Sequence, residues 1–346
     1  MTRDHMIRDD ITRVVRAIVV SVVCVVMVTS VTACGAPHAL LGIHDAPKAK
    51  ATSAPLTVDH AERILTRAFT AAYRGEATTG AAAVAAQKTA YTGQGLRAVR
   101  ARVKLAGIRP AVAGSSLLAP ERPQLLAVSR GFGFPRFIVA QTVASGGGLP
   151  ILHLLISPDA ATPYRISMSA EMVPLAKVKP FDPLSQGSPL VTGGTGLAVA
   201  PTALLNRYAA WMAFPAKSVN KLPFAADSFS GQVRGQAAGV AKDVAGQATF
   251  SQVHKVVTNS AYAVRQASGD ALVFGVIERE DSFKVKSDQT VNTVANKAFV
   301  LLTGKKKVTR SASISTLEFV VFAVPRSKRK ATLVAAREQV VAGSGS

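Results

Sequence analysis

The sequence predicts an α+β fold built from two similar modules, each with helices packed on an antiparallel sheet. Apolar residues at helical spacing open each half of the chain, and runs typical of strands follow them. A stretch rich in glycine, proline and serine at residues 183–200 lies between the halves. These observations place the first module at 58–182 and the second at 201–346.

The first module begins with a helical pattern. Thr57 is placed to cap it, because a threonine hydroxyl can accept a bond from a free N–H of the first turn. A second helical pattern covers Leu96 to Ala106, with Arg97, Arg100 and Lys104 opposite its apolar side. The apolar face of the first helix consists of Ile64, Leu65, Ala68, Phe69 and Ala72. The strand patterns are Leu125–Ser129, Arg136–Val143, Ile151–Ser157 and Tyr164–Val173.

The second module repeats this order of elements. Pro201 suits the first position of a helix, whose apolar stripe includes Leu204, Tyr208 and Trp211. Residues 225–248, rich in Gly, Ala and Ser, indicate a loop or a weak helix. The strand patterns are Phe250–Val257, Tyr262–Gln266, Leu272–Arg279, Thr316–Val324 and Thr332–Val341.

Helices on one face of a sheet would bury its alternating apolar positions and leave the other face polar. The element order is compatible with a cystatin-like or nuclear-transport-factor-2-like arrangement. This is an analogy of shape, and such folds carry many functions.

The N-terminus carries the strongest signal. Four arginines precede an apolar stretch from Ala17 to Val31, which is typical of a signal peptide. That stretch ends in Val31-Thr32-Ala33-Cys34, a branched apolar residue and two small residues before a cysteine. The pattern predicts a signal peptide over 1–33, a lipid on the Cys34 thiol, and a flexible tether over 34–57.

The Val31–Cys34 lipobox, the Ala/Val/Thr-rich composition and the turn Tyr91–Leu96 resemble uncharacterised secreted lipoproteins of actinobacterial type. This resemblance implies a lipid-anchored protein at the extracytoplasmic face of the cell membrane. It brings no catalytic or binding residues. Cys24 would leave with the signal peptide, so the mature chain would hold no disulfide.

The chain is strongly basic. Residues 1–33 hold four of its 41 basic and three of its 20 acidic side chains, so processing would leave 37 and 17, a net charge of +20. Outside the membrane the available anions are phospholipid headgroups, wall polymers and acidic envelope proteins, and nucleic acid is a poor candidate. The candidate binding residues form two basic clusters: Lys305, Lys306, Lys307 and Arg310, then Arg326, Lys328, Arg329 and Lys330. A solvated surface is the alternative interpretation of both.

Catalytic sets are missing from the sequence. His153 and His254 lie in strand patterns, where a hydrogen-bonded sheet histidine is the simpler interpretation. The Ser218–Lys221 pattern lacks the other motifs of penicillin-binding enzymes. No histidine pair has the spacing of a helical zinc site, so we expect no metal and no cofactor.

The sequence therefore favours a membrane-anchored, non-catalytic protein that binds a ligand or partner. A carrier of a lipid or other hydrophobic ligand is the alternative, because the strands at 151–156 and 319–324 are apolar on both faces. An enzyme with a pocket histidine is the third possibility.

Overall fold

The computed structural model describes residues 52–106, 123–143, 148–216, 218 and 221–346, and three helices open this part of the chain. α3 (Val58–Ala77) begins as predicted, with the Thr57 hydroxyl accepting a hydrogen bond from the His60 N–H at 3.3 Å. α4 (Gly80–Ala90), a helix of small residues that packs on α3, was not predicted. α5 (Gly93–Leu105) follows it.

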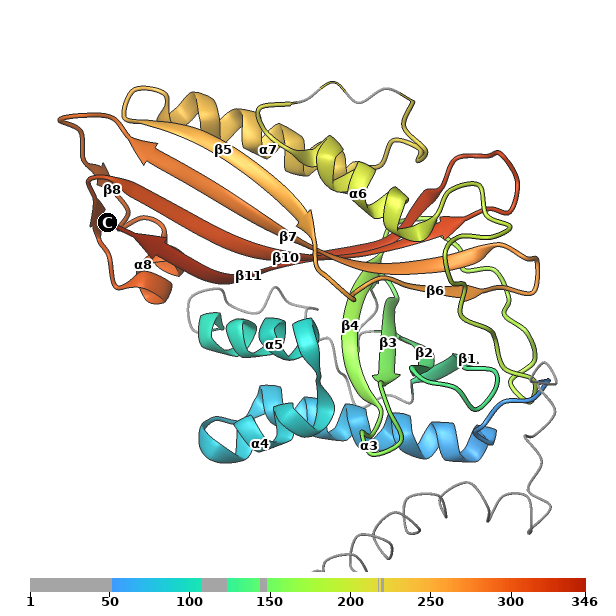
Figure 1. Cartoon of the computed structure of the whole chain (residues 1–346). Coiled ribbons are helices and arrows are strands. Elements are labelled where there is room, and N and C mark those ends of the chain that lie inside the picture. The colour runs from blue at the N-terminus through green and yellow to red at the C-terminus, as the bar shows by residue number, and fades with distance from the viewer. Residues whose placement is uncertain (1–51, 107–122, 144–147, 217, 219–220) are drawn as a thin grey trace, which may run out of the picture. The chain divides into compact units, whose positions relative to one another are not determined.

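A sheet of nine strands forms the centre of the fold (Figure 1). Its order is β1-β2-β3-β4-β11-β10-β7-β5, with β6 also paired to β7, and every one of these pairs is antiparallel. The strands are β1 (Gln124–Val128), β2 (Arg136–Thr142), β3 (Ile151–Ser157), β4 (Arg165–Met172), β5 (Ala248–Val256), β6 (Tyr262–Arg265), β7 (Ala271–Val285), β10 (Ser311–Val324) and β11 (Thr332–Gly345).

Three more helices belong to the second half of the chain. α6 (Pro201–Met212) has the predicted proline at its start. The predicted loop or weak helix at 225–248 is a regular helix, α7 (Ser228–Val244), because the Asp227 carboxylate accepts bonds from the Ser230 N–H and hydroxyl. We call residues 284–310 the tip; they include β8 (Val291–Asn292), α8 (Lys297–Thr303) and β9 (Lys307–Val308).

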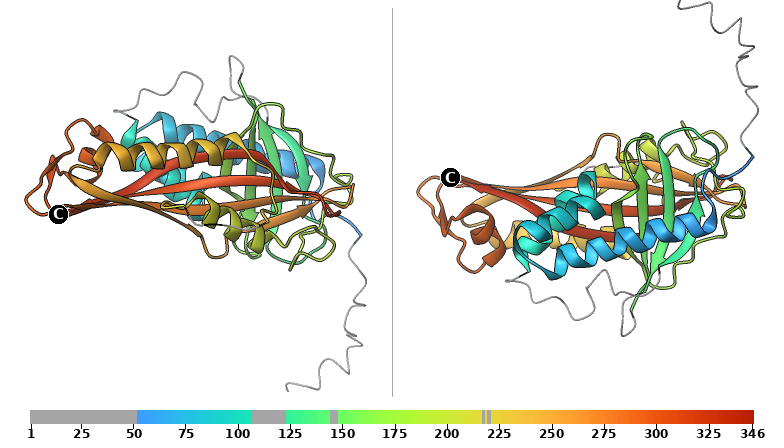
Figure 2. Two further views of the ribbon diagram at one scale, coloured as in Figure 1. Left: turned by 90° about the horizontal axis from the view of Figure 1, so that it is seen from above. Right: turned by 90° about the horizontal axis from the view of Figure 1, so that it is seen from below.

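The sheet packs in layers around three apolar cores. α3 covers one face of β1–β4, with Phe69, Ile138 and Leu155 in the core between them. The other face of β1–β4 packs against β7 and β10, where Leu154 and Phe274 are fully buried. α6 and α7 cover the opposite face of β7 and β10, as the left view of Figure 2 shows.

The α+β class is confirmed, but the finer arrangement differs from the prediction. The prediction placed helices on one face of a sheet and left the other face polar. Instead, the two parts of the sheet pack face to face, and helices cover the outer face of each part. The similar modules and the cystatin-like or nuclear-transport-factor-2-like shape are not confirmed. The strands on either side of 183–200 join one sheet through Ala335–Ala336 and Glu171–Met172, and the described residues form one unit.

The long β10–β11 hairpin separates two ends of this unit. Its strands have fourteen residues each, so its turn lies about 40 Å from the tip. The described chain enters at the end with the hairpin turn: the Ser53 carbonyl accepts from Gly131 N–H, and Ala54 N–H donates to Ser185. Figures 1 and 2 both show the start of the coloured chain and the hairpin turn at one end and the tip at the other.

Candidate anion-binding site

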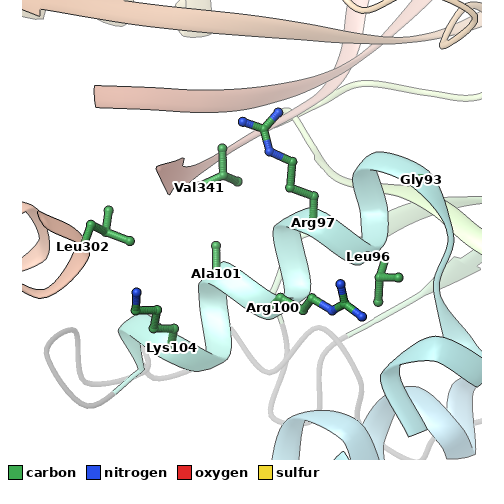
Figure 3. A pocket seen from close by; sticks show the side chains of 8 residues that line it. All are labelled: Gly93, Leu96, Arg97, Arg100, Ala101, Lys104, Leu302 and Val341. Carbon is green, nitrogen blue, oxygen red and sulfur yellow. The ribbon is translucent and has the colours of Figure 1, made fainter. Parts of the chain in front are cut away.

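A cleft of about 350 Å³ lies beside α5. We call it the α5 cleft. Figure 3 shows its basic residues on successive turns of α5, with Leu302 of α8 and Val341 of β11 across the open space. The lining residues are Gly93, Leu96, Arg97, Arg100, Ala101, Lys104, Leu302 and Val341.

Local sequence explains why α5 presents these cations. Its apolar side holds Ala98, Val99 and Leu105, which are buried, so residues offset by about half a turn must face outward. Gly95 brings the helix close to the sheet, because a Cβ there would lie 2.7 Å from the carbonyl oxygen of Ser167. Arg100 and Lys104, one turn apart on the outer side, are exposed.

The three cations of the α5 cleft differ in their partners. Arg97 Nη2 lies 2.7 Å from Glu278 Oε1, and this hydrogen bond holds the pKa of the Glu278 carboxyl below its usual range. Arg100 and Lys104 belong to no ion pair between described residues. The α5 cleft therefore keeps a net positive charge that an anionic group could neutralise.

More charge lies beneath α5. Arg102 and the Tyr91 hydroxyl both bind the Glu76 carboxylate, so the charge of Arg102 is already paired with that of Glu76. Arg337 of β11 faces the same space and has no ion pair with a described residue. Burial lowers the pKa of Arg337 to about 10, with the nearby Arg102 acting in the same direction. Arg337 remains charged at neutral pH and adds to the positive potential behind the α5 cleft.

The predicted basic clusters do not form one patch. Lys305, Lys306, Lys307 and Arg310 belong to the tip, whereas Arg326, Lys328, Arg329 and Lys330 surround the hairpin turn at the other end. Cys34 lies outside the described residues.

The two strand histidines are both enclosed. His153 is fully buried between the Thr142 and Ser169 hydroxyls, each 2.8 Å from a ring nitrogen. His254 Nδ1 lies 2.9 Å from Glu318 Oε2, and neither side chain is exposed to solvent. A histidine beside a carboxylate is therefore present, with both side chains shielded from solvent.

Several features of the candidate site were not visible in the sequence. Arg97, Arg100 and Lys104 were expected on one helix face, but nothing in the sequence placed Leu302 and Val341 opposite them.

Among the described residues, no group of three or more metal-ligating side chains could hold an ion. No helix in the same part of the chain is long and apolar enough to span a bilayer. No family model, curated protein or solved structure matches the chain.

Proposed function

We propose that this chain is a lipoprotein, anchored through Cys34 at the extracytoplasmic face of a cell membrane, that binds an anionic envelope polymer without catalysing a reaction. The anchor is supported by the charged leader, the apolar stretch and the lipobox at Val31–Cys34. The observation that supports binding is the α5 cleft, in which Arg100 and Lys104 lie beside apolar Leu302 and Val341.

The position of the α5 cleft favours a wall polymer over lipid headgroups. α3 starts at the end where the described chain enters, and its 20 residues carry the chain about 30 Å towards α5. A tether from Cys34 would hold the entry end nearest the bilayer. The hairpin turn with Arg326–Lys330 would then lie nearer the anionic headgroups than the α5 cleft does.

Catalysis is a weaker interpretation. A general acid or base must come within hydrogen-bond reach of its substrate, directly or through one water. The side chains of His254 and Glu318 are both shielded from solvent. A carrier function remains a second candidate, because the tip holds an apolar pocket.

The anchor is tested by Cys34→Ala in the full chain. We expect unprocessed precursor and no labelling by a fatty-acid probe, because the thiol is the group that receives the lipid. Cys24→Ala is the control and should be processed normally, since Cys24 belongs to the leader. Undiminished labelling of Cys34→Ala would refute the anchor.

The α5 cleft is tested by the double variant Arg100→Gln/Lys104→Gln, with binding to a synthetic poly(glycerol phosphate) measured by calorimetry. Two exposed charge contacts contribute roughly 0.2–1 kcal/mol each, so we expect affinity to fall about two- to thirtyfold. Arg63→Gln/Arg67→Gln removes two exposed bases, also one turn apart, from α3 and should change affinity less than twofold. Equal losses would mean that net charge alone attracts the polymer, and the proposal would fail.

A further inference from the structure

A second pocket, of about 200 Å³, lies between the tip and the adjoining ends of α7, β5, β7 and β10, and the surface that lines it is almost entirely apolar. Phe283 and Ile314 come from the end of the long strands, and Val291, Phe299 and Val308 come from β8, α8 and β9. Phe299 is 3% exposed and Val308 is 1% exposed, so a small core of their own holds these walls in place.

Size and lining indicate the kind of group that would enter. A cavity of about 150 Å³ lined by aliphatic and aromatic side chains stays dry and binds benzene. The pocket in the tip is larger and similarly lined, so an alkyl chain would enter more readily than a polar group. Asn296 does not contradict this, because its side-chain oxygen already accepts a bond from the Phe299 N–H.

The positive charge beside the pocket indicates that the other end of the ligand is anionic. The tip has seven basic side chains and one acidic side chain, Asp288. Two lining residues hold the lysine run in place: Asn292 pairs with Lys307, and Thr293 bonds to the carbonyls of Lys305 and Lys306. Lys305–Lys307 are exposed and take part in no ion pair between described residues.

We infer that the tip binds a single-chain anionic amphiphile, with the alkyl chain in the apolar pocket and the carboxylate or phosphate against Lys305–Lys307. This inference rests on the second candidate function, a carrier of a hydrophobic ligand, and is independent of the α5 cleft. Such a ligand would match both the apolar pocket and the basic cluster of the tip.

The first test varies the chain length of the ligand. The full chain, held in nanodiscs of neutral phosphatidylcholine, is titrated with butyrate, hexanoate and octanoate by calorimetry, with empty nanodiscs as the blank. Burying one more methylene should strengthen binding roughly fourfold until the pocket is full. Affinity that does not depend on chain length would overturn the inference, because charge alone would then explain binding.

The second test fills the pocket. Ala312 lines it from β10, and Ala312→Leu should lower octanoate affinity at least tenfold while butyrate changes less. Ala298→Leu adds the same side chain to α8 outside the lining and is the matched control. Should Ala312→Leu not fold, Val291→Ala enlarges the pocket and should improve decanoate binding over octanoate. Unchanged octanoate affinity in Ala312→Leu, or no gain for decanoate in Val291→Ala, would overturn the inference.

The third test removes the charge and separates a free amphiphile from a membrane surface. Lys305→Gln/Lys306→Gln/Lys307→Gln should weaken octanoate binding about three- to tenfold, and Lys328→Gln/Arg329→Gln/Lys330→Gln at the hairpin turn should not.

If Ala312→Leu adheres to phosphatidylglycerol vesicles as the natural chain does but no longer binds octanoate, the ligand is a free amphiphile. Loss of vesicle adhesion as well would identify a membrane lipid as its source. Equal weakening of octanoate binding by both triple variants would overturn the role of the lysine run. The response of the α5 cleft to Arg100→Gln/Lys104→Gln is unaffected by any of these results.

Discussion

His153 of β3 and His254 of β5 both lie inside the sheet, but their surroundings differ. His153 is held by two neutral hydroxyls. Its ring packs edge-to-face with that of Phe69, and the two ring centroids are 4.8 Å apart. His254 contacts Glu318, whose other oxygen lies 3.2 Å from the Arg279 guanidinium. Arg279 also reaches Asp281 and Glu338.

The two halves of the sheet therefore bury polar groups by different means. The hydroxyls around His153 satisfy a neutral ring and require no counter-charge. The group around Arg279 holds one cation among three carboxylates, and burial raises the pKa of the Asp281 carboxyl. Removing one member of the charged group around Arg279 leaves other buried charges without a partner. The hydroxyls around His153 hold a neutral ring, so that arrangement is disturbed mainly when the ring takes up a proton.

The largest effect is expected from Arg279→Met. It removes the cation that neutralises Glu318, a fully buried carboxylate, and should lower the free energy of unfolding by about 3–5 kcal/mol. Urea unfolding at pH 7, followed through the single Trp211, measures it. Arg97→Met breaks the half-exposed pair with Glu278 and should cost less than about 1 kcal/mol. Equal losses would mean that burial does not distinguish the two ion pairs.

For each pH unit, a smaller effect is expected for His153 as the pH falls. Burial lowers the pKa of His153 to about 3, with Arg337 acting in the same direction. Between pH 6.5 and pH 3 the unfolded chain binds a proton on this ring that the folded chain does not. Stability should therefore fall by up to about 1.4 kcal/mol per pH unit through that window.

His153→Gln tests this assignment, because other groups also titrate in the window. The glutamine amide can still bond to hydroxyls but does not take up a proton. The variant should lose stability less steeply than the natural chain between pH 6.5 and pH 4 in urea titrations. Parallel curves would show that His153 does not cause the acid sensitivity.

The sequence predicted the first half of the sheet more closely than the second. Ile151–Ser157 is apolar on both faces and matches β3 at both ends. The pattern for β7 was predicted to end at Arg279, yet the strand continues to Val285. Asp281 looks like a loop residue in a sequence, because its partner Arg279 is held in turn by Glu318 of β10 and Glu338 of β11, which are distant in the sequence.

The candidate site shows the same limit. Helical spacing on α5 was enough to place Arg97, Arg100 and Lys104 together. It could not place Leu302 and Val341 opposite them, because that contact depends on how α8 packs on β11 some 200 residues later. The pocket of the tip escaped prediction for a similar reason, since its walls come from short elements with weak periodicity.

The helices over the two halves also differ in how closely they approach the sheet. α5 packs on β4 through Gly95, where a Cβ would lie 2.7 Å and 2.8 Å from the carbonyl oxygens of Ser167 and Ile166. Gly239 of α7 has open space in the direction of a Cβ. Its helix is buried only through Ser230, Val233 and Ala237.

The smallest effect expected is a difference of sign between alanine substitutions at these two glycines. Gly95→Ala meets backbone carbonyls that no side-chain rotation can move, so overpacking of about 1–3 kcal/mol should exceed the gain in helix propensity of up to about 1 kcal/mol. Gly239→Ala meets nothing and should stabilise the protein by about 0.5–1 kcal/mol, because alanine loses less backbone entropy than glycine on folding. Thermal unfolding of the two variants beside the natural chain measures both shifts. If Gly95→Ala also stabilised the protein, α5 would have room to move away from β4, and the close approach of α5 would not distinguish the first half of the sheet from the second.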